Sequence, residues 1–237
     1  MNPKYLYLAL DLFSVSIPLI ASFYPKAPFY RTWRSLWIAI LLPAILFLVW
    51  DELFTRAGIW GFNPDYLTGI YIGSLPLEEI LFFICIPYAC VFTYFAMNYL
   101  IEKDVLWASH EIITSVLIIF LLVSGLYNIE KAYTATTFML LAIFLAYELL
   151  KRRVRYTGRF YVAFAVILIP FFLINGILTG SFIPDEVVWY DNTHNLGIRL
   201  GTIPVEDVFY GMLLLMLNVS IYDRLQSRQN RKEKALK

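Results

Sequence analysis

Charged residues are scarce in this chain of 237 amino acids. Asp, Glu, Lys and Arg together make up 16% of it, whereas 60% of its residues are hydrophobic. The mean hydropathy is +0.66. The polar residues are too few to cover the surface of a water-soluble globular protein of this size. The composition therefore excludes an ordinary soluble protein and predicts an integral membrane protein.

Cysteine and histidine are nearly absent. Cys85 and Cys90 lie five positions apart in one predicted helix, on different faces and too far apart for a disulfide. His110 and His194 each stand alone, and no metal-ligand spacing occurs. The glycines match neither a phosphate-binding loop nor a dinucleotide fingerprint. We therefore expect no metal and no nucleotide or flavin cofactor.

Long apolar runs dominate the sequence instead. Seven of them approach the roughly 20 residues that a helix needs to cross the hydrocarbon core of a bilayer. They lie near residues 5–24, 35–50, 79–100, 112–127, 134–149, 160–178 and 205–222. The first is interpreted as a helix and not as a signal peptide, because no cleavage site follows its apolar part. The expected fold is all-α, with about seven transmembrane helices.

Basic residues are distributed unevenly between the two sides that alternating spans would create. One side carries four, namely Lys4, Arg56, Lys131 and Arg199. The other side carries fifteen, namely Lys26, Arg31, Arg34, Lys103, Lys151, Arg152, Arg153, Arg155, Arg159 and the six basic residues from Arg224 onward. Cytoplasmic loops are the ones enriched in Lys and Arg. We therefore expect a protein of the cytoplasmic membrane with its C-terminus in the cytoplasm.

The basic tail that follows the last span has almost no apolar residues to bury. It runs from Arg224 to the end of the chain. Such a composition is typical of disordered segments and of weak anchors to anionic lipid. We expect this tail to be disordered.

Two acidic helix starts, in residues 73–83 and 201–210, align without a gap at an offset of 128 residues. Each places two adjacent carboxyls at the edge of an apolar span: Glu78 and Glu79 in the first, Glu206 and Asp207 in the second. A single pair would be explained by helix capping, since acids favour the N-terminus of a helix. Charged carboxyls in or beside hydrocarbon cost several kcal/mol, however, so the repetition indicates a functional site.

The offset also suggests an internal repeat. Leu41-Leu42-Pro43 resembles Leu168-Ile169-Pro170 at nearly the same spacing. We expect two three-helix repeats of the same orientation, related by an axis along the membrane normal, with a site at their interface. The expected organisation is a first repeat over 1–100, a connector helix over 101–130, a second repeat over 131–225 and a basic tail over 226–237.

Aromatic, amide and acidic residues crowd the loops before the two acidic helices. The motifs are Trp50-Asp51, Gly58 to Pro64 (GIWGFNP), Leu75 to Glu79 (LPLEE), Asn175 to Thr179 (NGILT), Tyr190, Gly197 to Arg199 (GIR) and Ile203 to Asp207 (IPVED). In this order, and over nearly the whole chain, they resemble the small integral-membrane lycopene cyclases. That family occurs as two short subunits or as one fused chain, and the length here is similar to the fused form.

The resemblance implies closure of the acyclic ψ ends of lycopene to β-ionone rings, giving γ-carotene and then β-carotene. This is an isomerisation without net redox change and without a cofactor. The residues fit that chemistry, which needs an acid, a base and a pocket that tolerates a cation. Desolvation in an apolar pocket favours the neutral form of a carboxyl, which can then act as a general acid. Aromatic faces stabilise a desolvated cation by about 2 kcal/mol each.

We predict that Glu78, Glu79, Glu206 and Asp207 supply the acid and the base, with their individual roles left open. The predicted substrate-binding residues are Asp51 and Arg199 as polar support, and Trp60, Asn63, Phe82, Phe83, Asn175, Tyr190, Phe209 and Tyr210. Trp60 and Tyr190 are equally compatible with an interfacial aromatic belt. Asp11, inside the first span, is a weaker candidate because the second repeat has no counterpart.

The expected partners are a carotene and membrane lipid, and no nucleic acid. Because a polyene is too apolar to pass through water, its end should reach the site sideways between helices, near the non-cytoplasmic face. Two alternative functions stay open, and a third is excluded by the sequence. A carotenoid hydratase would add water to the same cation, and a transporter could also use parallel repeats with intramembrane acids. A retinal-binding photoreceptor would need a lysine in the last span, and residues 205–222 contain none.

Overall fold

The computed structural model describes residues 2–151 and 156–235 of the chain. Within these ranges seven helices are long and apolar enough to cross a membrane, which confirms the all-α membrane fold. They are α1 (Leu6–Ala21), α2 (Trp33–Arg56), α3 (Leu77–Leu100), α4 (His110–Tyr127), α5 (Ala132–Leu150), α6 (Thr157–Leu178) and α7 (Val205–Ala235). Arg152, Arg153 and Arg155 of the basic cluster lie outside the described residues.

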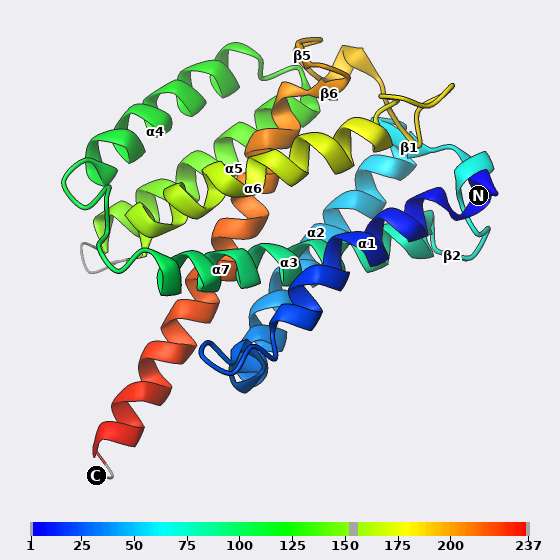
Figure 1. Ribbon diagram of the computed structural model, residues 1–237. Coiled ribbons are helices and arrows are strands. Elements are labelled where there is room, and N and C mark those ends of the chain that lie inside the picture. The colour runs from blue at the N-terminus through cyan, green and yellow to red at the C-terminus, as the bar shows by residue number, and fades with distance from the viewer. Residues whose placement is uncertain (1, 152–155, 236–237) are drawn as a thin grey trace.

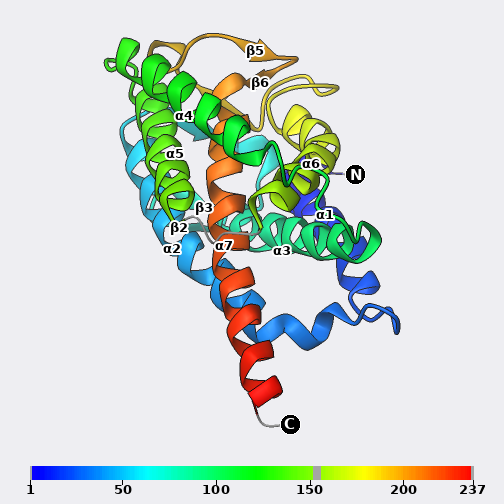
Figure 2. The same cartoon turned by 90° about the vertical axis from the view of Figure 1, so that its left-hand side faces the viewer.

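Helix α7 runs through the middle of the molecule, as the side view shows (Figure 2). In that view α5 and the C-terminal part of α2 lie to one side of it, α1, α3 and α6 lie to the other, and α4 crosses in front of it. Two of the helix contacts recur in both predicted repeats. α1 packs on α3 as α5 packs on α7, and α2 packs on α7 as α6 packs on α3. α4 lies along α5 (Figure 1).

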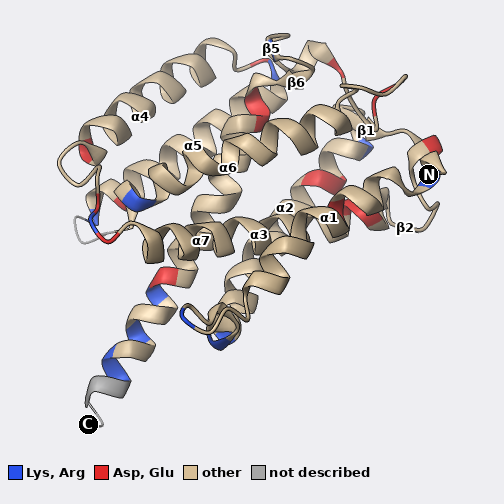
Figure 3. Cartoon of the chain, in the orientation of Figure 1, with Lys and Arg blue, Asp and Glu red and all other residues tan. Residues whose placement is uncertain are grey.

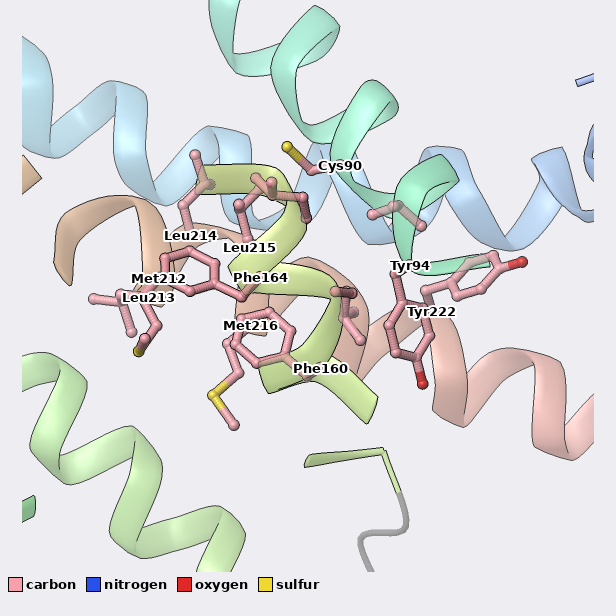
Figure 4. Packing of buried hydrophobic residues seen from close by; sticks show 14 of the residues in the cluster. Cys90, Tyr94, Phe160, Phe164, Met212, Leu213, Leu214, Leu215, Met216 and Tyr222 are labelled. Carbon is pink, nitrogen blue, oxygen red and sulfur yellow. The ribbon is translucent and has the colours of Figure 1, made fainter. Parts of the chain in front are cut away.

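The central core is built on α7. Leu214 and Leu215 of this helix lie beside Phe164 of α6, with Cys90 of α3 close by (Figure 4). Met216 is fully buried in the same cluster. Lipid tails are as apolar as the side chains of a membrane helix, so the hydrophobic effect does not drive such helices together. Close packing of this kind holds them together instead.

The predicted disorder of the basic tail is wrong, because α7 continues without a break to Ala235. Helix formation is costly at its first turn and cheap to extend, and the membrane span supplies that first turn. The tail residues are mainly Arg, Lys, Gln and Glu, which are good helix formers, and the tail contains neither Gly nor Pro. Low hydrophobicity therefore did not prevent helix formation here.

Short strands shape the loops that precede α3 and α7. β2 (Tyr71–Ile72) pairs with β3 (Leu75–Pro76), and β5 (Arg199–Leu200) pairs with β6 (Ile203–Pro204). These two hairpins match at the offset of 128 residues. Gly73 and Gly201 occupy the same place in their turns, both with φ +68°. Only glycine adopts such a backbone conformation without strain, which explains why both turns carry it.

Two further strands join the predicted repeats directly. β1 (Trp60–Phe62) and β4 (Val188–Tyr190) occupy equivalent positions at the same offset, and they pair antiparallel with each other. Gly61 faces Trp189, its own equivalent, so a pseudo-twofold axis would pass through this pair. We propose that the units 1–100 and 131–225 are copies related by that axis, a proposal that the matching hairpins and helix contacts support.

Charges separate along the molecule. The N-terminus and the strand-bearing loops lie far from the C-terminus, where α7 carries a run of basic residues (Figure 3). Inside the apolar helices, acidic residues appear on α1, α2 and α3 and at the start of α7. A polar region therefore lies within the membrane domain, between these helices.

Candidate active site

A cavity of about 320 Å³ lies between α1, α3, α6 and α7. Most of its wall is apolar, but three carboxyl side chains reach it: Asp51 from the end of α2, Glu79 from the start of α3 and Asp207 from the start of α7. All three helix ends belong to the side that carries the strands. The carboxyls therefore meet at one end of an otherwise greasy cavity, and residues from both predicted repeats contribute.

Asp51 and Glu79 form a pair of carboxyl groups in contact. The indole Nε1 of Trp60 donates to Oδ1 of Asp51 at 2.5 Å, and the Tyr7 hydroxyl donates to Oε2 of Glu79 at 2.5 Å. Among the described residues no N–H or O–H group donates to the second oxygen of Asp51. The side chains are almost fully buried, with exposed fractions of 2% and 8%. A proton shared between the carboxyls would satisfy this arrangement.

Asp207 has different surroundings. Tyr133 at the start of α5 donates its hydroxyl to Oδ1 at 2.6 Å, and Tyr190 of β4 donates to Oδ2 at 2.9 Å. Burial, and next the Asp207 carboxyl itself, raise the pKa of the Tyr190 hydroxyl well above its usual range, so this group stays a donor. The Arg199 guanidinium lies over the outer face of the Tyr190 ring, 5.4 Å from its centroid. Burial disfavours a charge on Asp207, whereas the two O–H donors and the nearby cation act in the opposite direction and stabilise its carboxylate form.

Four aromatic rings surround this end of the cavity. Trp60 lies 5.1 Å from Tyr133 and 6.2 Å from both Tyr190 and Tyr210, measured between ring centroids. Tyr133 and Tyr190 are stacked at 5.9 Å. All four residues line the cavity. The negative faces of these rings attract a cation, and they stabilise it without forming a covalent bond to it.

Glu78 and Glu206 lie behind the cavity wall and not on it. Each accepts a hydrogen bond of 2.7 Å from a backbone N–H ten residues earlier, that of Thr68 in one case and of Leu196 in the other. Adjacent residues on a helix point about 100° apart, so only one carboxyl of each pair reaches the cavity. The structure thus brings Glu79 and Asp207 together with Asp51, while their neighbours fix the preceding loops.

The angle of about 100° between adjacent helix residues also decides which of the predicted aromatic residues line the cavity. Phe82 and Tyr210, which are equivalent at the 128-residue offset, both line the cavity. Phe83 instead packs against Phe47 of α2, with ring centroids 6.1 Å apart. Phe209 packs against a core ring of α5 at 5.0 Å. One ring of each adjacent pair therefore lines the cavity, and the other, Phe83 or Phe209, belongs to the core.

The predicted polar support is divided in the same way. Asn175 of α6 lines the cavity. Asn63 lies outside the lining and caps a short helical turn by accepting from the Asp65 backbone N–H at 3.0 Å. Arg199 donates to Asn192 at 2.6 Å and holds the loop before α7. Its contact with the site is through the Tyr190 ring.

Two tyrosines were missed by sequence reasoning. Tyr7 and Tyr133 are each the second residue of the first helix of a predicted unit, and each donates to the carboxyl that reaches the cavity. They are 126 residues apart, whereas the acidic starts are 128 apart, so a comparison at one fixed offset does not align them. A separate comparison of the two first helices would have found them.

Asp11 of α1 is fully buried, and neither of its oxygens has a hydrogen-bond partner among the described residues. It is not among the residues that line the cavity. In the part of the chain that the structure describes, no group of three His, Cys, Asp or Glu residues is arranged to hold a metal ion.

Comparison with known proteins identifies the family. A family model described as lycopene cyclase matches residues 4–97 and 130–225, the two predicted repeats without the connector helix. The bifunctional lycopene cyclase/phytoene synthase of Aspergillus niger is 33% identical over 69 residues, which are 28% of this chain and 12% of that protein. No solved structure matches the chain. The chain belongs to the lycopene cyclase family.

Proposed function

We propose that the protein is a lycopene β-cyclase, an isomerase of the intramolecular lyase type that converts lycopene to γ-carotene and then to β-carotene. The observation that carries the proposal is the meeting of three carboxyls with four aromatic rings at one end of an apolar cavity. Family membership supports the same substrate class. The reaction requires a proton to enter, a cation to survive and a proton to leave.

The Asp51–Glu79 pair is the proposed acid. Two carboxyls in contact and away from water retain a proton, as in other enzymes with carboxyl dyads. That proton is transferred to the terminal double bond of the ψ end group. The electron pair of the double bond forms the new C–H bond and leaves a tertiary cation at the neighbouring carbon.

The aromatic rings then protect the cation while the ring closes. The next double bond of the substrate attacks the cationic carbon, which forms the ring bond and moves the charge to another tertiary carbon. Trp60, Tyr133, Tyr190 and Tyr210 lie around the carboxyls and stabilise this charge. The apolar lining keeps water, which would trap the cation, at a distance.

Asp207 is the proposed base. Its hydrogen bonds from Tyr133 and Tyr190 favour the carboxylate, which removes a proton from the new ring. Loss of that proton restores a double bond within the ring, so the product is an isomer of the substrate. The proton gained from one carboxyl is balanced by the proton delivered to the other.

Pigment analysis in a lycopene-accumulating bacterium tests the proposed function. Expression of the chain should convert lycopene to β-carotene, with monocyclic γ-carotene appearing first because one end group occupies the carboxyl end of the cavity at a time. Retention time, absorption and mass identify each product. Products heavier by one water would instead indicate a hydratase, and unchanged lycopene beside folded protein would contradict the proposal.

We also propose that the strand-bearing loops face the non-cytoplasmic side and that α7 ends in the cytoplasm. The basic residues at the C-terminal end of the molecule support this orientation (Figure 3). A reporter fused to the C-terminus should be active in the cytoplasm only. Activity outside the cytoplasm would reverse the orientation and leave the chemistry of the site unchanged.

A further inference from the structure

The cavity extends along several turns of the helices that line it. Along α3 its lining runs from Glu79 to Thr93, a distance of about 21 Å at the rise of an α-helix. Along α1 it runs from Tyr7 to Pro18, about 17 Å. The carboxyls occupy one end, and the other end points toward the C-terminal half of α3. This shape is a slot that runs lengthwise through the helix bundle.

The slot is too small for a complete carotene. Its volume of about 320 Å³ is at the low end of the cavities that enclose a drug-sized ligand, and lycopene has forty carbons. A space of this volume and length accommodates one end group and a stretch of extended polyene. The remainder of the substrate must lie outside the protein.

One side of the slot is open to the bilayer. Phe13 and Ile17 of α1 line it, yet they are 59% and 65% exposed. Leu173 of α6 lines it from the opposite wall and is 52% exposed. Residues that face both the cavity and the lipid define an opening between α1 and α6.

The pseudo-equivalent groove is closed. It would lie between α5 and α2, on which Phe47, Phe138 and Leu141 are buried in the central core. Helix α4 also covers α5, whereas among the described residues no helix covers the corresponding face of α1. The two units are therefore unequal, and the open slot occurs on one side of the molecule only.

We propose that this open-sided slot holds the polyene of the carotene lengthwise, with the far end of the substrate in the bilayer beyond α1 and α6. The inference rests on the proposed function and extends it to the substrate class. Because the far end makes no contact with the protein, the enzyme recognises a single ψ end. Any linear carotenoid with one ψ end is then a substrate, whether its other end is acyclic, cyclic or hydroxylated.

The variant Ala89→Phe tests the slot. Ala89 lines its floor about 15 Å from Glu79 along α3, so a phenyl ring there obstructs the polyene and leaves the carboxyls untouched. Conversion of lycopene should fall by at least about tenfold, the scale of a misfit in an apolar pocket. The matched control is Ala96→Phe, two turns further along the same face of α3 and beyond the lining. It should convert lycopene as the wild type does.

A truncated apocarotenoid distinguishes a blocked slot from a general loss of enzyme function in the variant. If it keeps one ψ end and a polyene shorter than about 15 Å, it ends before Ala89 and should be cyclised equally by the wild type and by Ala89→Phe. Should Ala89→Phe fold poorly, Ile17→Trp places the same bulk at the same depth on the lipid-facing wall and should give the same discrimination.

Three results would overturn the proposal. They are full activity of Ala89→Phe and Ile17→Trp on lycopene, equal loss of lycopene and truncated substrate by folded variants, and rejection of a carotene whose far end is hydroxylated. If the wild type does not cyclise lycopene at all, the proposed function fails by itself. The slot is then judged by the lycopene that co-purifies with the wild type and Ala96→Phe but not with Ala89→Phe.

Discussion

Glu79→Gln and Asp207→Asn should each lower the conversion of lycopene by at least about 100-fold, because each removes a group that transfers a proton in the transition state. Both amides keep the size of the side chain and one carbonyl oxygen, so the hydrogen bond from Tyr7 or Tyr133 can remain. The measurement is the rate of cyclisation per folded molecule in membranes that contain lycopene.

The sequence neighbours of these residues provide matched controls. Glu78→Gln and Glu206→Gln keep the oxygen that accepts from the backbone of Thr68 or Leu196, and the second oxygen of each carboxylate has no partner among the described residues. We expect their rates to stay close to that of the wild type. If the controls lost activity while Glu79→Gln and Asp207→Asn kept it, the assignment of the site would be reversed.

The two inactive variants should also differ from each other. Without the Asp51–Glu79 acid no cation forms, so Glu79→Gln should leave lycopene unreacted. In Asp207→Asn the cation can form but its normal base is missing. Slow leakage to hydrated or rearranged products is then the expected signature. Identical behaviour of the two variants would argue against separate roles for the two carboxyl sites.

Tyr210→Leu should reduce turnover by about 30-fold, the equivalent of about 2 kcal/mol of lost cation stabilisation. Tyr210→Phe keeps the ring and should remain close to the wild type. This contrast distinguishes the aromatic face from the hydroxyl. It is the opposite of what we expect at Tyr133, whose hydroxyl donates to Asp207.

Phe209→Leu is the control for the aromatic prediction. Phe209 is the neighbour of Tyr210 in sequence, but it packs into the core against Phe138 and does not line the cavity. Its replacement should lower the thermal stability of the protein with little change in turnover per folded molecule. A large loss of turnover in Phe209→Leu, with none in Tyr210→Leu, would place the cation elsewhere.

The helices could be predicted from the sequence because apolar length alone determines a membrane span. Which of two adjacent side chains faces the cavity could not be predicted from the sequence. Glu78 and Glu79 are adjacent and chemically alike, and which of them faces the cavity depends on where α1 and α6 pack. The same is true of Phe82 and Phe83. Their assignment required the arrangement of helices in space.

Other features depended on contacts between distant segments. The pairing of β1 with β4 joins strands 128 residues apart that are too short to be recognised from alternation of residues. Tyr7 escaped detection because the first helix of one unit is shifted by two residues relative to the other. The composition of the tail alone predicts disorder, whereas its helical structure continues from the membrane span before it.

Single-turnover cyclisation in D₂O tests the central claim most directly. Enzyme in excess over lycopene is first equilibrated in D₂O, so that the Asp51–Glu79 pair carries deuterium, and the products are analysed by mass. Proton transfer from a carboxyl predicts one deuterium for each ring that has closed, and none in Glu79→Gln, which forms no ring. Rings that close without taking up deuterium would contradict a mechanism initiated by these carboxyls.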